Sequence, residues 1–152
     1  MAKPLSVADL MSRNPITVQP DTPLREVLNL MRRDDCRQLP VVDANGSLVG
    51  IVTDRDVRLA MNSPLTLRER WQDTELLESV TAEGCMSADP VTVGADSPAY
   101  LAAEMLITYK FGALPVVEAD SLVGIISVTD FLQYFSEEQR RGSGAWQEVE
   151  SN

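Results

Sequence analysis

The most restrictive feature of this sequence is an internal repeat. MSRNPITVQPDTP begins at residue 11, MSADPVTVGADSP begins at residue 86, and LPVV follows each of them at the same distance. Residues 11–42 and 86–117 share 11 identities in 32 positions, and SLVGIVTDRD from residue 47 then matches SLVGIISVTD from residue 121 in 6 of 10. Because the order of segments is preserved, we interpret the chain as a tandem duplication of a unit of about 55–60 residues.

Each copy predicts the same order of elements: strand, helix, strand, strand, helix. In the first copy a strand at 16–18 is followed by a helix that opens at Thr22-Pro23. Two strands, at 39–42 and 48–52, are joined by a hairpin turn at Ala44-Asn45-Gly46, and a second helix then runs from Thr53 to about Met61. In the second copy they are strands at 91–93, 114–117 and 122–126, a helix opening at Ser97-Pro98, and a helix from Ser127 to about Phe135. Thr22 is expected to be the N-cap and Pro23 the first helical residue. One such unit cannot bury its sheet alone, so we predict a mixed α/β (α+β) fold in which the two copies pack face to face around a pseudo-twofold axis.

The predicted boundaries place the first copy at residues 5–62 and the second at 81–135. Between them, residues 63–80 predict a polar helical connector, anchored by Leu67, Trp71 and Leu77, that caps a cleft or only joins the copies. Residues 136–152 are charged, contain Gly142-Ser143-Gly144, and are expected to be a flexible tail. Trp146 in this tail is either an ordinary tail residue or a docking residue for a partner.

The charge of the chain disfavours one class of partner. Its 152 residues carry a net charge of −10. Because a protein this acidic repels the phosphate backbones of nucleic acids, we expect no nucleic-acid binding. The charge is uneven, because residues 1–75 carry 10 Lys and Arg against 11 Asp and Glu, whereas residues 76–152 carry 3 against 12. A small anionic ligand is therefore expected to find the first half less repulsive.

Residues suited to metal binding and catalysis are scarce. The chain has no histidine and two cysteines, Cys36 and Cys85, which fit no zinc pattern and are expected to be buried or half-buried free thiols. Without histidine, a Cys or Ser nucleophile lacks its usual base, so we predict no enzymatic activity and no catalytic residues. No signal peptide and no apolar run of about 18 residues is present, so a soluble cytoplasmic protein that does not enter the membrane is expected.

The duplicated motifs resemble a known family. P-x-T-V, then L-P-V-V, then G-I-V-T-x-x-D, present twice in this order, resembles the cystathionine β-synthase (CBS) domain, and two in tandem resemble a CBS pair, or Bateman module. The resemblance covers most of the chain. It implies clefts between the repeats that bind an adenosine-containing ligand such as AMP, ADP, ATP, S-adenosylmethionine or NAD. It also implies a homodimer formed through helices, and a sensor that regulates an attached or partner protein.

The motif GIVTDRD has a structural and a functional interpretation. Thr53 with Asp56, and Ser127 with Asp130, occupy the first and fourth positions of a helix capping box. The same helix start offers amide donors and a positive dipole end to a phosphate, and a carboxylate there can accept both ribose hydroxyls. The resemblance implies that the hydroxyl residues contact phosphate or ribose and that the two aspartates hold the ribose.

The resemblance also implies where an adenine ring lies, between the first and second strands. Backbone groups there can read the edge of the ring while aliphatic side chains enclose it, although core packing alone also explains these aliphatic residues. The residues concerned are Ile16, Thr17, Val18, Leu39, Pro40 and Val41, and at matching positions Val91, Thr92, Val93, Leu114, Pro115 and Val116. Gly50 and Gly124, which lack a side chain, are expected to let neighbouring backbones approach.

The first copy carries cations around its capping box that the second copy lacks. They are Arg37, Arg55 and Arg58, and the second copy has Gly112 and Thr129 at the positions of Arg37 and Arg55. Each arginine alone is either a solvated surface charge or a phosphate ligand. Together with the uneven charge they favour the site around Asp56 for a phosphorylated nucleotide. The site around Asp130 is then weaker, empty or suited to a less charged adenosine compound.

The first helix of each copy also differs. At the positions of Leu24, Val27, Leu28 and Met31 the second copy has Ala99, Ala102, Ala103 and Leu106. These small residues, with Met105 and Tyr109 nearby, indicate either a self-association face or ordinary packing on the sheet. Our leading hypothesis is a non-catalytic sensor that binds a regulatory adenosine ligand, holds no tightly bound cofactor and signals to a separately encoded partner. The alternative is a ligand-free CBS-pair dimer with a structural role.

Overall fold

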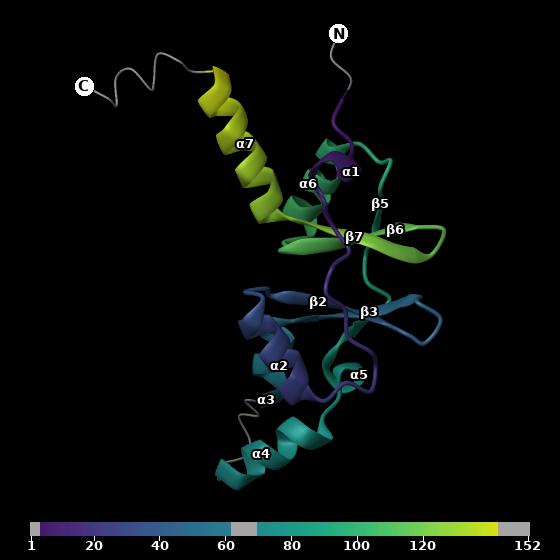
Figure 1. Ribbon diagram of the computed structural model, residues 1–152, viewed down its shortest axis with the longest axis vertical. Helices are drawn as coiled ribbons and strands as arrows, with labels where there is room; N and C mark the ends of the chain where they lie inside the picture. The colour runs from purple at the N-terminus through teal and green to yellow at the C-terminus, as the bar shows by residue number, and fades with distance from the viewer. Residues whose placement is uncertain (1–3, 62–69, 143–152) are drawn as a thin grey trace, which may run out of the picture.

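The computed structural model describes residues 4–61 and 70–142 of the chain. Two small β-sheets face each other across the middle of the molecule, and helices lie on their outer sides (Figure 1). Each sheet takes most of its strands from one copy of the repeat. The observed architecture is therefore mixed α/β with two tandem units, as the sequence predicts.

The first sheet has three antiparallel strands in the order β2-β3-β4. They are β2 (Gln38–Val42), β3 (Leu48–Thr53) and β4 (Ser87–Ala88). In the turn between β2 and β3, an Asp43 carboxylate oxygen accepts hydrogen bonds from the Asn45 and Ser47 backbone N–H groups. Gly46 follows with φ 81°, a conformation that favours glycine, so the predicted turn is confirmed.

The second sheet has four strands in the order β1-β7-β6-β5. They are β1 (Ser12–Arg13), β5 (Val93–Gly94), β6 (Ala113–Glu118) and β7 (Ser121–Ser127). Strand β5 pairs in parallel with β6, and the other pairs are antiparallel. In the first half Val18 takes the place of β5, because its backbone bonds to that of Pro40 and Val42 over 3.0 and 2.9 Å. The strand predicted at residues 16–18 is thus reduced to one bridging residue.

The described residues form seven helices, which lie outside the two sheets. They are α1 (Val7–Leu10), α2 (Leu24–Arg33), α3 (Asp54–Met61), α4 (Arg70–Ser79), α5 (Ala82–Cys85), α6 (Ala99–Tyr109) and α7 (Val128–Gly142). Helices α1, α6 and α7 lie beside the sheet that contains β6 and β7, and α2, α3 and α5 lie beside the sheet that contains β2 and β3, with α4 farther out and in contact with α2 (Figure 1).

Each half has its own apolar core between its sheet and its helices. In the first half the buried side chains include Leu24, Val27 and Met31 of α2, whose spacing places them on one helix face. In the second half α6 buries the smaller Ala99, Ala102 and Leu106. These three residues pack within the chain, so ordinary packing on the sheet explains them.

The two halves exchange short segments, which we call the exchanged segments, residues 5–13 and 80–88. Strand β1 pairs with β7 of the second half, and β4 pairs with β3 of the first half. Val7 in α1 is buried in the second core, and Ala82 in α5 is buried in the first core. Backbone hydrogen bonds of 2.8 Å fix both crossings, from Val7 N–H to the Ser97 carbonyl and from Ala82 N–H to the Thr22 carbonyl. Each sheet is therefore completed by a segment from the other half.

Gly50 and Gly124 make these crossings possible. A β-carbon on Gly50 would lie 2.9 Å from the carbonyl oxygen of Ser87, and one on Gly124 would lie 2.8 Å from that of Ser12. Real β-carbons do not approach backbone oxygens so closely, so a side chain at either glycine would push the exchanged strand away. The expectation that these glycines permit close backbone approach is confirmed.

Two details of the predicted helices are wrong. Helix α2 begins at Leu24 with Pro23 as its N-cap, while the Thr22 hydroxyl instead accepts a hydrogen bond from the Gln19 N–H over 3.0 Å. Helix α7 continues to Gly142, beyond the predicted end at Phe135, because no proline or other helix breaker interrupts residues 136–141.

The predicted connector and tail are described only in part. Helix α4 occupies the later part of the connector predicted at residues 63–80. Residues 136–142 of the predicted tail belong to α7. The anchor Leu67 and the tail residue Trp146 lie outside the described residues.

Candidate functional site

Both predicted capping boxes form. In the first, Thr53 N–H donates to Oδ2 of Asp56 over 2.9 Å, and Asp56 N–H donates to the Thr53 hydroxyl over 3.1 Å. In the second, the corresponding distances between Ser127 and Asp130 are 2.8 and 3.2 Å. These reciprocal bonds hold each aspartate at the N-terminus of its helix. No hydrogen bond from the described residues reaches Oδ1 of Asp56.

A cleft of about 600 Å³ opens beside the first capping box and is lined by both halves of the chain. The first half contributes Thr53 and Asp56 together with Arg37, Ile51, Arg55 and Arg58. The second half contributes Val91, Tyr109, Lys110, Phe111, Gly112 and Pro115. Of its two capping residues, Thr53 ends β3 and Asp56 lies in the first turn of α3, and the opposite wall comes from the end of α6 and the start of β6. A site between the repeats thus has contributions from each.

The predicted site residues divide into three groups. Six of them line this cleft together: Arg37, Thr53, Arg55, Asp56, Val91 and Pro115. Six others are buried in the two apolar cores: Val18, Leu39 and Val41 in the first, and Val93, Leu114 and Val116 in the second. The remaining six lie outside both groups, namely Ile16, Thr17, Pro40, Thr92, Ser127 and Asp130.

This division follows from the geometry of strands. Successive side chains of β2 and β6 point to opposite faces, so the leucines and valines that flank Pro40 and Pro115 enter the cores. The core-packing explanation therefore accounts for those leucine and valine side chains. Only backbone groups of these core residues are left to contact a ligand.

The cleft is rich in positive charge. Arg37, Arg55, Arg58 and Lys110 line it, against two carboxylates, Asp54 and Asp56. Arg58 lies 3.8 Å from Asp54, a long and exposed ion pair on α3. Among the described residues Arg37, Arg55 and Lys110 form no ion pair. An anionic ligand therefore does not have to displace a carboxylate of the described residues from these three side chains.

The end of α6 supplies lining residues that the sequence analysis did not assign to the site. Tyr109 and Phe111 stack with ring centroids 5.4 Å apart and planes inclined by 15°. Lys110 lies between them with φ 58°, in the left-handed conformation. The repeat alignment contained one signal, because all three residues differ in character from their counterparts Asp34, Asp35 and Cys36.

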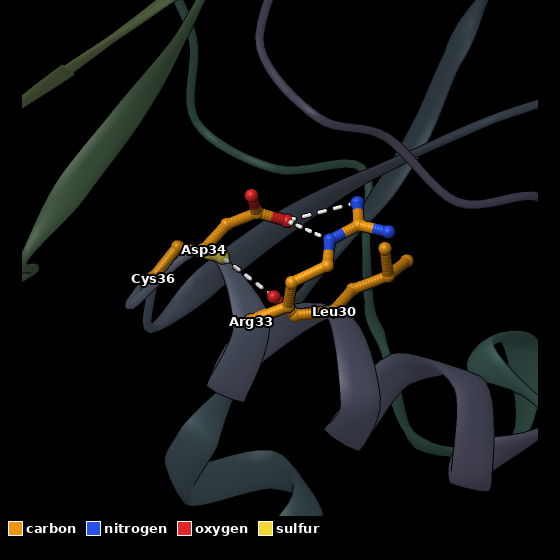
Figure 2. Close-up of polar contacts among 4 residues, drawn as sticks. All are labelled: Leu30, Arg33, Asp34 and Cys36. Carbon is orange, nitrogen blue, oxygen red and sulfur yellow. Dashed lines mark hydrogen bonds and ion pairs between the residues drawn. The ribbon is translucent and has the colours of Figure 1, made fainter.

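Figure 2 shows how the equivalent helix end of the first half is built. The Arg33 guanidinium forms an ion pair with the Asp34 carboxylate at 3.0 Å, and the Cys36 thiol lies 3.9 Å from the carbonyl oxygen of Leu30. An ion pair and a thiol thus occupy the positions that the second half fills with two stacked rings. The two helix ends share a backbone path and present different chemistry.

Both thiols are half-buried and lack a disulfide partner among the described residues. Burial raises the pKa of Cys85, and the nearby Asp56 carboxylate raises it further. Burial also raises the pKa of Cys36, with a further contribution from Asp34. Both side chains therefore remain neutral thiols near pH 7, as poor nucleophiles.

Two classes of feature are missing from the part of the chain that the structure describes. Within residues 4–61 and 70–142, no three His, Cys, Asp or Glu side chains are arranged to hold a metal ion. In the same residues no helix is both long enough and apolar enough to cross a membrane.

Comparison with known sequences agrees with the repeat. The family model described as CBS domain matches residues 7–63 and 80–137. A CBS domain-containing protein of Dictyostelium discoideum is 35% identical over 127 residues, covering 83% of this chain and 88% of that protein. Inosine-5'-monophosphate dehydrogenase of Korarchaeum cryptofilum is 34% identical over 132 residues, but the chain spans only 24% of that enzyme's length.

Solved structures share the fold over most of the chain. The crystal structure of CBSX2 in complex with AMP has a TM-score of 0.74 at 29% identity, and the match covers 87% of this chain and 97% of that one. The CBS domain pair of protein MJ0100, in complex with 5'-methylthioadenosine and S-adenosyl-L-methionine, has a TM-score of 0.74 at 26% identity, covering 90% and 99%. The chain belongs to the CBS domain family, and its two tandem repeats form a CBS pair.

Proposed function

We propose that this chain is a non-catalytic regulatory module that binds an adenosine-containing ligand in the cleft around Asp56 and signals to a partner protein. The observation that carries the proposal is the arrangement of that cleft. The Asp56 carboxylate, one oxygen of which accepts no hydrogen bond from the described residues, and the N-terminus of α3 face a wall from the other repeat. Three of the cations around them form no ion pair within residues 4–61 and 70–142. The carboxylate suits the two hydroxyl groups of a ribose, and the helix N-terminus with the cations suits the adjoining phosphate.

The structural relatives support the same class of ligand. CBSX2 was solved with AMP, and the MJ0100 pair with 5'-methylthioadenosine and S-adenosyl-L-methionine. All three ligands contain adenosine, so the shared chemistry is a ribose and an adenine ring. We include the absence of a tightly bound cofactor and a cytoplasmic location in the proposal, as expected from the sequence.

The proposal is tested by thermal unfolding with AMP, ADP, ATP, S-adenosylmethionine and NAD. A ligand at about one hundred times its dissociation constant adds about 2.7 kcal/mol of stability. In a domain of this size that corresponds to a rise in melting temperature of about 5–10 °C. At least one of the five compounds is expected to produce such a shift.

Two matched variants locate the binding site. Asp56→Ala and Asp130→Ala remove the same capping-box carboxylate from the two copies, so each is expected to cost similar basal stability. Only Asp56→Ala is expected to abolish the ligand-induced shift. Tight binding that survives Asp56→Ala and disappears in Asp130→Ala would contradict the assignment. A chain that responds to none of the ligands would instead support a ligand-free structural role.

We also propose that the module forms a homodimer through α6 and α7. These helices expose a run of large apolar side chains, among them Tyr100, Ile107, Leu132 and Phe135, each more than 60% exposed. An apolar groove of about 360 Å³, lined by Leu106, Ile107, Val128 and Phe131, runs between the two helices. Apolar patches of this kind on a folded domain mark association surfaces.

A further inference from the structure

We propose that Lys110 is a specificity-determining residue that makes the Asp56 cleft prefer a nucleoside di- or triphosphate to a monophosphate. The inference rests on the proposed function, since it requires that the cleft binds a nucleotide. It concerns how far the phosphate site extends from the ribose. The residue comes from the opposite repeat, so it acts across the cleft from the capping box.

The backbone at position 110 does not explain a lysine there. Lys110 ends α6 in the left-handed conformation, at φ 58°. Glycine is the residue that this helix-ending conformation favours, and a lysine there is strained. The matching residue of the first repeat, Asp35, has φ 48°, and aspartate is one of the residues that tolerate this conformation. A cation here complements the negative C-terminal end of the α6 dipole, but the dipole alone does not require a lysine in a strained conformation, which leaves room for a further reason outside local structure.

The cleft supplies that reason. Lys110 lines both the cleft and the apolar groove between α6 and α7, as a side chain with an apolar stem and a charged end can do. It forms no ion pair among the described residues. Its long side chain can place that charge over the space between the two repeats.

The number of cations in the cleft, and the fact that they come from both repeats, favour a ligand with more than one phosphate group. A monophosphate carries a charge of about −2, which Arg37, Arg55 and the N-terminus of α3 can match from the first repeat alone. Lys110 adds positive charge from the other repeat. Two cation groups on opposite walls suit an extended anion, and a polyphosphate chain has that shape and charge.

The pseudo-equivalent positions of the other copy act as an internal control. The second copy has Gly112, Thr129 and Leu132 at the positions of Arg37, Arg55 and Arg58, and the first copy has Asp35 at the position of Lys110. Not one of these four is a cation. Because the duplicated backbone is shared, the cations cannot be a requirement of the fold itself.

The test is isothermal titration calorimetry with AMP, ADP and ATP, in a buffer free of divalent cations because Mg²⁺ would neutralise the phosphates. Wild type is expected to bind ADP or ATP more tightly than AMP. Lys110→Gly is expected to weaken ADP or ATP binding about tenfold and to leave AMP binding within about twofold. Lys110→Arg keeps the charge and is expected to keep the preference. Raising the ionic strength should weaken ATP binding more than AMP binding.

Ala119→Gly is the matched control for the backbone. Ala119 also has a positive φ, 49°, and lies at the β6–β7 turn, so glycine relieves the same kind of strain away from the cleft. This variant is expected to bind all three nucleotides as wild type does. Lys110→Gly should remain folded, because glycine suits the conformation better than lysine.

The outcomes separate the inference from the proposed function. AMP binding equal to ATP binding in wild type, or a preference that survives Lys110→Gly, would overturn the role of Lys110 and leave the nucleotide site in place. A preference lost equally in Ala119→Gly would also overturn it, because the cause would then be the backbone. No binding of any nucleotide would overturn the inference together with the function on which it rests.

Discussion

At the scale of single residues, the two copies can share a backbone conformation and still carry side chains of different chemistry. Lys110 and Asp35 both adopt positive φ at the end of a helix, yet one is a cation that lines the cleft and the other an anion. The neighbouring pairs follow the same pattern, because the stacked rings of Tyr109 and Phe111 replace Asp34 and Cys36. Duplication has therefore preserved the conformation and left the side chains free to diverge.

The two thiols make a prediction about alkaline stability. Burial raises the pKa of Cys36 and of Cys85 above the ordinary value of 9.0, so the folded state favours the neutral thiols. The unfolded chain ionises first as the pH rises through about 9, so it binds fewer protons than the folded chain and the free energy of unfolding falls. The loss of stability between pH 7.5 and pH 10, measured by urea denaturation, should be smaller in the double variant Cys36→Ala, Cys85→Ala. An equal loss in both proteins would show that the thiols contribute nothing.

At the scale of elements, four of the six predicted strands and their two hairpin pairings were predictable, whereas the strands predicted at 16–18 and 91–93 are reduced to a bridge at Val18 and to β5 (Val93–Gly94). The strands at 39–42, 48–52, 114–117 and 122–126 were predicted from β-branched runs and turn residues, and each is found within a residue of its predicted ends. The exchanged segments were not anticipated, because β1 and β4 are two residues long and have no periodicity of their own. Their partners lie in the other half, and only a tertiary contact fixes that choice.

The candidate site was predictable to the same extent. The capping boxes and the arginines stand in motifs that can be read locally, so Thr53, Asp56, Arg37 and Arg55 were assigned from the sequence. The opposite wall, including Lys110, depends on how the two halves face each other. No pattern along the chain predicts that Lys110 lies near the first capping box, because the two are more than 50 positions apart in the sequence.

The close approach of β3 and β4 gives a prediction about stability. Gly50→Ala would place a β-carbon 2.9 Å from the Ser87 carbonyl oxygen, so the exchanged strand must shift. We expect the free energy of unfolding to fall by about 1–3 kcal/mol. Gly142→Ala is the control, because nothing lies within 4 Å of that position, and it should leave stability nearly unchanged. Equal stability of the two variants in chemical denaturation would mean that the crossing tolerates a side chain.

At the scale of the whole molecule, α6 and α7 expose an apolar face that the described residues do not cover. Its residues include Tyr100, Ile107, Leu132 and Phe135, and these remain exposed although both cores are filled. The Asp56 cleft lies at one end of the same helix, since Lys110 lines both the cleft and the groove between α6 and α7. A ligand in the cleft and a partner on this face would therefore both contact Lys110.

The proposed homodimer is tested by the oligomeric state. Ile107→Glu introduces a charge at a side chain that is 74% exposed on this face, and it should shift the protein from dimer to monomer in light scattering. Thr108→Glu is the control, because it adds the same charge at the neighbouring exposed position, away from the apolar groove. Because both positions are exposed, neither variant should lower the melting temperature by more than about 2 °C. A monomeric wild type, or a dimer that survives Ile107→Glu, would contradict the interface.

The exchange of segments has a consequence for chains that carry only one repeat. Such a chain would leave one edge of its sheet uncovered and its N-terminal arm without a site, so it would be complete only as a swapped dimer with a second copy. Joining two repeats in one chain turns that bimolecular step into an intramolecular one, with an effective concentration on the order of millimolar for a short linker. Cutting this protein between its repeats should therefore yield two fragments that bind each other rather than two independent domains.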